Sequence, residues 1–348
     1  MWMGTRRYVY NRSLEAVKNG EKINFYDLRN KFVTFKDNDN VKEWELDTPK
    51  DIRAGAIRDM VKNYKTAFAN LRNNNIDGFN LGFCRKKDAP SIEIPKSSLK
   101  LEDGDIFMYK KYIPEKIRVA RREKLKFTIE YDCRLQIKNN KWYLTVPIKT
   151  EVKSKENSCE WCSMDPGVRT FQTVYSEECV LEIEVRKEIL KKLQEKLDNF
   201  KSLRDRKIIS RCHYKRRERK LYNRLDNLID DLHHKTCSIL TNTYNHIILP
   251  CFESQKMSKG GMIRGMNRNL LQLKHYLFKE RLKSKCEIMS NTIDICSEEY
   301  TSQTCGLCGG ITKVGGASVF KCQYCDVTIG RDINGARNIG IKRLKETL

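Results

Sequence analysis

The spacing of apolar residues changes along the chain, and each spacing predicts a different kind of element. Across residues 52–71, apolar side chains recur at intervals of three and four, which predicts a helix. Thr48 precedes it and is expected to cap it through its hydroxyl, while Pro49 suits the first turn. Residues 5–35, which are basic with interleaved aromatics, also read as helical. The first eighty residues are therefore expected to be mainly helical.

From about residue 80 to 150, the apolar period falls to two. Apolar and polar residues alternate strictly over residues 125–137, and again over residues 142–148. The four polar residues between these runs form a turn, so the pattern predicts a β-hairpin within a small β domain. Pro147 cannot donate a hydrogen bond to a neighbouring strand, which places the return strand at an edge or a bulge.

Residues 186–247 have leucines spaced by three and four in two runs, which predicts a helical hairpin. Between the runs, residues 201–220 hold ten Lys or Arg and only two acids. Such a charged stretch can be a solvated face, but at the tip of a hairpin it also suits contact with phosphates. The candidate nucleic-acid contacts are Arg204, Arg206, Lys207, Arg211, Lys215, Arg216 and Arg217. A further helix is expected over residues 266–285, followed by a strand over residues 292–296.

The amino-acid composition predicts what kind of partner the protein binds. A chain of 348 residues is long enough for about two or three domains. It has 68 Lys and Arg against 45 Asp and Glu, a net charge of +23. We interpret the excess as favouring a nucleic-acid partner over solubility alone. The sequence shows no secretory leader and no apolar run near the ~18 residues of a membrane span. A reducing compartment is therefore expected, with no secretion and no membrane partner.

Four of the fourteen cysteines form two pairs with a spacing typical of metal sites. Cys305 with Cys308 and Cys322 with Cys325 are both CxxC pairs, with 13 residues between them. Four thiolates can close a tetrahedral shell around Zn²⁺, which leaves no open position for a substrate. The pattern therefore predicts a structural zinc site, and disulfides do not suit a reducing compartment.

Two aspartates, one before and one after the cysteine pairs in the sequence, are candidate catalytic residues. Asp165 ends a strand-like segment and is followed by Pro-Gly, while Asp332 stands at the start of a basic helix. Either could be ordinary, as a turn residue or as an acid at a helix N-terminus. Together they suit phosphodiester hydrolysis with two Mg²⁺ ions, which needs carboxylates that converge from distant segments. A third carboxylate is expected from Glu253, Glu298 or Glu299, and the residues alone leave that choice open.

At these residues the chain resembles the TnpB and Fanzor nucleases, which are transposon-encoded relatives of type V CRISPR effectors. The likeness covers nearly the whole chain and is most specific in its C-terminal third. The matching stretches are residues 7–11, 48–53 with Ala56, 164–167, 300–305 with Cys308, the second cysteine pair, and 331–339.

The resemblance implies an α+β multidomain fold with a recognition lobe, a wedge domain and a nuclease domain. The nuclease domain would be an RNase H-like (RuvC) α/β domain with an inserted zinc ribbon. The implied boundaries are a helical recognition lobe at 1–79, a small β-barrel wedge domain at 80–158, a RuvC-like domain at 159–300 that includes the hairpin 186–247, the zinc ribbon at 301–328 and a C-terminal RuvC helix at 329–348. The family normally has a strand before its first helix, so the barrel here is expected to lack one.

The implied activity is RNA-guided cleavage of DNA next to a short motif that the protein reads. The partners would be a non-coding guide RNA from the transposon end and double-stranded target DNA, with base pairing reading the sequence. Asp165, Glu298 and Asp332 would hold the two Mg²⁺ ions.

The third carboxylate departs from the usual pattern of the family. TnpB-like proteins commonly start a Glu-Asp-Leu…Met motif with it, and alignment on Met257 puts Pro250 there. Fanzors and some TnpBs instead place a Glu just before Tyr-Thr-Ser. This favours Glu298, then Glu299 and then Glu253. It also favours a eukaryotic or large-virus source, and hence the nucleus; a bacterial source would mean the cytoplasm.

Two other hypotheses remain open from the sequence. The chain could be an RNA-guided DNA-binding protein that has lost cleavage, or a zinc-ribbon DNA-binding accessory factor of a transposon that uses no RNA. A serine-type recombinase does not fit, because we find no resolvase-like motif with a nucleophilic serine.

Overall fold

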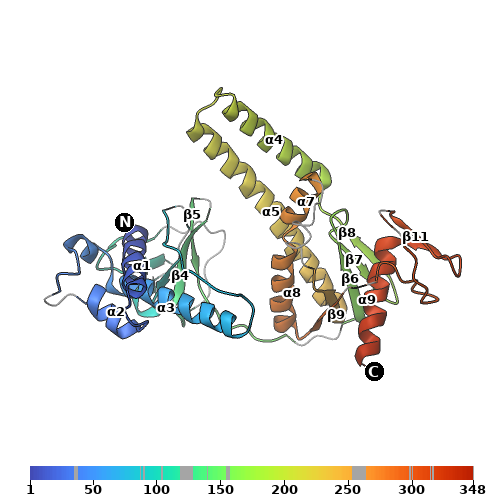
Figure 1. The fold of residues 1–348 in the computed structure, drawn as a ribbon, viewed down its shortest axis with the longest axis horizontal. Helices are drawn as coiled ribbons and strands as arrows, with labels where there is room; N and C mark the ends of the chain where they lie inside the picture. Colours follow the sequence, from blue (N-terminus) through green and yellow to red (C-terminus); the bar gives the residue numbers. More distant parts are fainter. Residues whose placement is uncertain are drawn as a thin grey trace. The chain divides into compact units, whose positions relative to one another are not determined.

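The computed structural model divides into two compact units, Met1–Lys149 and Thr150–Leu348, which are described separately below (Figure 1). It describes residues 1–34, 38–86, 88, 91–102, 105–117, 128–138, 140–153, 157–252, 264–297, 299, 301–313, 315 and 317–347. Glu253 and Glu298, two of the three predicted glutamates, lie outside the described residues. The finer division into lobe, wedge, nuclease domain and ribbon stays a prediction.

The first unit begins with helices that pack on one another. They are α1 (Trp2–Lys18), α2 (Phe25–Phe32) and α3 (Lys50–Arg72), with the short 3₁₀ helix η1 (Glu43–Asp47) before α3. Val9, Leu28 and Ile57 are buried between the three main helices. The predicted helical stretch 5–35 is therefore two helices, because Gly20 adopts a left-handed conformation just after α1.

The predicted helix cap at Thr48 is wrong. Thr48 is fully buried, and its hydroxyl donates to the hydroxyl of Thr5 at 2.8 Å, while among the described residues it makes no capping hydrogen bond to the start of α3. Pro49 flanks the helix instead, and no side chain caps that end. The hydroxyl thus links α1 to the start of α3, because a buried hydroxyl needs a partner and Thr5 supplies it.

The predicted β-hairpin is confirmed over residues 133–138 and 141–145, but both strands are shorter than predicted, because residues 128–132 and 146–148 are not in strands. β4 (Cys133–Lys138) pairs with β5 (Lys141–Thr145), with Leu135 opposite Leu144. β1 (Ser91–Ile94) completes this sheet in the order β1-β4-β5, while β2 (Leu99–Glu102) and β3 (Asp105–Met108) form a separate pair, with the 3₁₀ helix η2 (Lys96–Ser98) before β2. Pro147 lies beyond the end of β5. The start of the predicted first strand, residues 125–127, lies outside the described residues, and the implied barrel stays a prediction.

The second unit is organised around a five-stranded sheet in the order β10-β9-β6-β7-β8. The strands are β6 (Cys159–Pro166), β7 (Gln172–Tyr175), β8 (Val180–Ile183), β9 (Tyr244–Pro250) and β10 (Thr292–Cys296). β6, β9 and β10 are parallel, so their carboxyl ends meet at one edge of the sheet. β7 and β8 are antiparallel to their neighbours. The predicted strand at residues 292–296 is thus confirmed as β10.

Helices cover both faces of this sheet (Figure 1). α4 (Lys187–Asp205) and α5 (Arg211–Thr243) form the predicted helical hairpin, which extends away from the sheet. α5 and α8 (His275–Met289) pack on one face, where Cys162 and Met164 of β6 join their core. α9 (Arg331–Thr347) packs on the other face.

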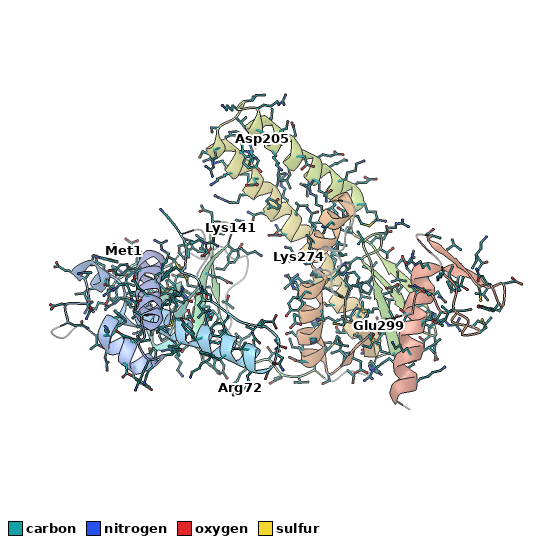
Figure 2. The ribbon with its side chains drawn as sticks, in the orientation of Figure 1. Met1, Arg72, Lys141, Asp205, Lys274 and Glu299 are labelled. Carbon is teal, nitrogen blue, oxygen red and sulfur yellow. The ribbon has the colours of Figure 1, made fainter. Side chains whose placement is uncertain are left out.

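The helix predicted over residues 266–285 is two helices in the structure. α7 (Arg264–Leu273) is followed by Lys274, which adopts a left-handed backbone and precedes α8. The ammonium of Lys274 pairs with the carboxylate of Asp226 on α5 at 2.5 Å, which fixes this break against the hairpin (Figure 2). In the described part of the chain, no helix has the length and apolar character needed to cross a bilayer.

Candidate metal centres

One face of β6 is built to receive α9 closely. Ser163 donates a hydrogen bond to the carbonyl of Ala336 at 2.7 Å, and both residues are buried. A Cβ at Gly340 would lie 2.7 Å from the Trp161 ring and 2.8 Å from the Ser163 hydroxyl. Since alternate residues of a strand share a face, Asp165 lies on the same side as Trp161 and Ser163. The helix can approach this face only because its contact residues are small.

This close approach places Asp165 against the first turns of α9. A Cβ at Gly335 would lie only 2.6 Å from Oδ2 of Asp165, so the carboxylate occupies the space that a side chain at 335 would need. Asp332 is three residues earlier, and residues three apart are neighbours on a helix surface. Asp165 is half-buried, and Asp332 is exposed. The structure therefore places Asp165 against the helical turn that follows Asp332, although the two residues stand 167 positions apart in the sequence.

The third carboxylate is less closely placed. Glu299 is exposed, and its backbone N–H donates to the hydroxyl of Ser297 at 3.4 Å. It follows β10, whose carboxyl end shares an edge with that of β6. Glu298 follows the same strand and Glu253 follows β9, so all three candidates come after strands that end at this edge. The choice among them stays a prediction.

Two residues in register with Asp165 did not figure in the sequence-based prediction. Thr173 on β7 lies directly opposite Asp165, and Glu182 on β8 lies directly opposite Thr173. Glu182 is exposed and lies two strands from Asp165, about 10 Å between backbones. Thr173 stands between the two carboxylates, so Glu182 is not the direct neighbour of Asp165 in the ladder. Thr173 could have been predicted from the register of the hairpin around Pro166 and Gly167, because that register places it opposite Asp165.

The four predicted zinc ligands are close together and have the right chemistry. Their sulfurs all lie within 4.8 Å of one another. The sulfurs of Cys305 and Cys325 are 3.6 Å apart, as are those of Cys308 and Cys322. A tetrahedral Zn²⁺ with bonds of about 2.3 Å would hold its sulfurs about 3.8 Å apart. The arrangement thus fits a structural Zn²⁺ held by all four cysteines.

The electrostatics of these thiols also favour a cation. Burial raises the pKa of Cys305, but the backbone N–H groups of Cys308 and Leu307 outweigh it and lower that pKa to about 6. The backbone N–H of Val327 lowers the pKa of Cys325, yet burial and the three other thiols raise it to about 12. One thiolate forms readily here, and a second beside it needs a positive charge to balance the pair.

The cysteine site is attached to α9 by two buried asparagines. The side-chain amide of Asn334 donates to the carbonyl of Thr304 at 2.7 Å, and its oxygen accepts from the N–H of Gly306 at 3.2 Å. Asn338 donates to the carbonyls of Thr301 and Thr304 at 2.8 and 2.6 Å. β11 (Val319–Lys321) pairs with β12 (Thr328–Gly330), which leads directly into α9. Both ends of the segment therefore meet the helix that carries Asp332.

Comparisons with known proteins identify relatives of this chain. The family model described as "Cas12f1-like, TNB domain" matches residues 275–339, and the one described as "Probable transposase" matches residues 145–259. The "Putative transposase A625R" of Paramecium bursaria Chlorella virus 1 is 31% identical over 363 residues, covering 97% of this chain and 81% of that protein. "TnpB-like protein L770" of Acanthamoeba polyphaga mimivirus is 27% identical over 372 residues, covering 97% and 69%. The chain belongs to the TnpB family.

A cellular relative of this TnpB-family chain has a more specific name. It is the "Putative RNA-guided DNA endonuclease InsQ" of Escherichia coli (strain K12). The two are 25% identical over 363 residues, and the match covers 97% of this chain and 86% of InsQ.

The TnpB-family chain carries its predicted nucleic-acid contacts at the tip of the α4–α5 hairpin, where Figure 2 labels Asp205. Arg204 pairs with Asp205 at 2.6 Å, and its guanidinium lies 4.4 Å from the centre of the Tyr214 ring. The other six are exposed and form no ion pair with a carboxylate among the described residues; they are Arg206, Lys207, Arg211, Lys215, Arg216 and Arg217. Cations without local acidic partners are available to phosphates, so the tip fits the predicted role, which stays a prediction.

Proposed function

We propose that this protein is an RNA-guided DNA endonuclease that hydrolyses target DNA with Mg²⁺ at Asp165, Asp332 and a third carboxylate. The observation that carries the proposal is the Asp165 carboxylate in the space beside Gly335, one turn from Asp332. Membership of the TnpB family and the printed name of InsQ support the RNA-guided activity. Glu298 is the first choice for the third carboxylate, followed by Glu299 and Glu253.

The chain's own residues would prepare the reaction by holding negatively charged carboxylates close together, where they can bind divalent cations. Two bound divalent ions would activate a water molecule and stabilise the leaving oxygen. Asp165 contributes from the end of β6, and Asp332 from the first turn of α9. The docking of α9 through Gly335, Ala336 and Gly340 sets the separation of the two carboxylates. An Asp at the end of one strand, followed by a hairpin into the next, supports an RNase H-like nuclease domain.

The remaining charge suits the nucleic acids. A guide RNA paired with target DNA presents phosphates that a protein can bind without reading sequence, and the net charge of +23 favours such contacts. In the proposed arrangement the hairpin tip contacts phosphates, the four-cysteine segment is a zinc ribbon, and the first unit provides the recognition lobe and wedge. A role in the nucleus belongs to the proposal as the expectation for a eukaryotic or large-virus source.

The test is to express the protein with its native flanking DNA, sequence the RNA that co-purifies, and then assay cleavage. We expect a discrete RNA with a constant scaffold and a variable end, and cleavage only of DNA that matches that end in the presence of Mg²⁺. A DNA with a scrambled match is the control. Guided occupancy without strand breaks would replace the proposal with a cleavage-deficient binder. Specific DNA binding by RNA-free protein would favour the accessory factor.

Replacing Gly335 with alanine should separate activity from stability. The new Cβ would lie 2.6 Å from Asp165 Oδ2, so the carboxylate must move, and a misplacement of about 1 Å can cost about 100-fold in rate. Alanine also favours a helix over glycine by about 1 kcal/mol, so the melting temperature should hold or rise. The measurements are the single-turnover cleavage rate and thermal unfolding.

The matched change is Gly340→Ala on the same helix. Its Cβ would meet the Trp161 ring at 2.7 Å rather than a carboxylate, so it should lower the melting temperature. A Gly335→Ala protein that cleaves at the wild-type rate would show that Asp165 does not act from this position.

A further inference from the structure

Thr173 carries a buried hydroxyl that makes no hydrogen bond to any described residue. It is directly opposite Asp165 in the β6–β7 ladder, so both side chains emerge on the face that α9 covers. The ring of Tyr175, two residues further along β7, lies 6.3 Å from that of Trp161, which faces α9. This contact shows that Tyr175 points to the same face of the sheet as Trp161. Thr173, two residues away on β7, therefore points to that face as well, beside Asp165.

The burial of this hydroxyl is complete and uncompensated. Thr173 is fully buried, and its Oγ1 has no hydrogen-bond partner among the residues that the structure describes. A buried hydroxyl without a partner destabilises a fold, and valine would fill the same volume without that cost. Residues directly opposite on paired strands have Cβ atoms about 4.5–5.5 Å apart, so another χ1 rotamer brings the hydroxyl towards the neighbouring carboxylate.

We propose that Thr173 is a positioning residue for the cleavage reaction. Its hydroxyl donates a hydrogen bond to the Asp165 carboxylate when that carboxylate holds a divalent cation, and so fixes the orientation of the ligand oxygens. This role resembles that of the outer partners of metal ligands, which are hydrogen-bonded to the ligating carboxylate. The inference rests on the proposed function, because it assigns the cation to Asp165.

The test compares Thr173→Val, which removes the hydroxyl, with Thr173→Ser, which keeps it. Mn²⁺ binding to the RNA-free full-length chain, followed by electron paramagnetic resonance, gives a readout that needs no cleavage. We expect Thr173→Val to weaken Mn²⁺ binding by about 10-fold, the lower end of the range for such partners. The Mn²⁺ concentration for half-maximal cleavage by the guide complex should rise in parallel, while Thr173→Ser stays within about twofold of the wild type.

Thr236 offers a matched control on α5. Its Oγ1 is also buried and has no partner in the described part of the chain, but Thr236 lies on α5, which packs on the opposite face of the sheet from α9. Thr236→Val should leave Mn²⁺ binding and cleavage unchanged. The inference is overturned if Thr173→Val binds Mn²⁺ like the wild type, or if Thr173→Ser is as weak as Thr173→Val. Wild-type protein that binds Mn²⁺ but never cleaves guided DNA would instead overturn the proposed function.

Discussion

Asp165→Asn should abolish DNA cleavage while guide-RNA binding and guided DNA binding persist. The amide keeps the size of the carboxylate but removes the charge that a divalent cation requires. Loss of an outer partner of a metal ligand costs about 10–100-fold, so loss of a ligand itself should exceed about 100-fold. Asp332→Asn should have the same effect, because its turn of α9 faces the same site. The measurement is the cleavage rate under saturating Mg²⁺, with RNA retention and target binding followed separately.

Glu182→Gln is the control for both changes. It removes one carboxylate from the same face of the sheet, two strands away from Asp165, and leaves the proposed cation site untouched. Its cleavage rate should equal that of the wild type. If Asp165→Asn retains cleavage, the hydrolytic site lies elsewhere; if it also loses its RNA, the assignment of Asp165 to the chemical step alone is wrong.

Removal of the proposed zinc should unfold the 305–325 segment and cost cleavage with it. Structural zinc sites of this type contribute about 10–16 kcal/mol of binding free energy in zinc-finger peptides, which is folding free energy for the segment. Cys322→Ser removes one ligand, and the carbonyls that Asn334 and Asn338 hold would lose their fixed positions. The expected result is loss of bound zinc, a lower melting temperature and a severe loss of cleavage.

The metal content of purified protein, measured by atomic emission, checks this directly. Wild-type protein should carry about one zinc per chain. Cys212→Ser changes an exposed cysteine on α5 and should leave zinc and cleavage as they were. Full zinc content in Cys322→Ser would show that the four cysteines are not the ligands.

Features encoded by short-range spacing were predictable from the sequence. The two CxxC pairs, the α4–α5 hairpin and the β4–β5 turn all depend on residues close together in the chain. Local spacing gave the wrong prediction at Thr48. The sequence around Thr48 suits a helix cap, but its hydroxyl donates a hydrogen bond to Thr5, which is distant in the chain. The break at Lys274 has the same origin, since the residue is held by Asp226 on another helix.

The candidate site depends on how α9 packs against β6, which the spacing of residues along the chain does not predict. Asp165 and Asp332 could be named from their surroundings, but their meeting results from the close approach of α9 to β6 through Gly335 and Gly340. Thr173 gave no signal of its own, because a threonine in a strand is common, while Asn334 and Asn338 lay in the matching stretch 331–339 without any indication of what they contact. Their roles follow from strand register and from hydrogen bonds to the backbone of another segment.

The asparagine attachment has a mechanical consequence. Asn334 and Asn338 hold the turn at residues 301–306 on the same helix that carries Asp332, so the cysteine segment and this carboxylate move together. A displacement of that segment would therefore act on α9, and a shift of α9 against β6 would change the distance between Asp332 and Asp165. Under the proposed function, cation binding would therefore be coupled to whatever holds the cysteine segment, through this single helix.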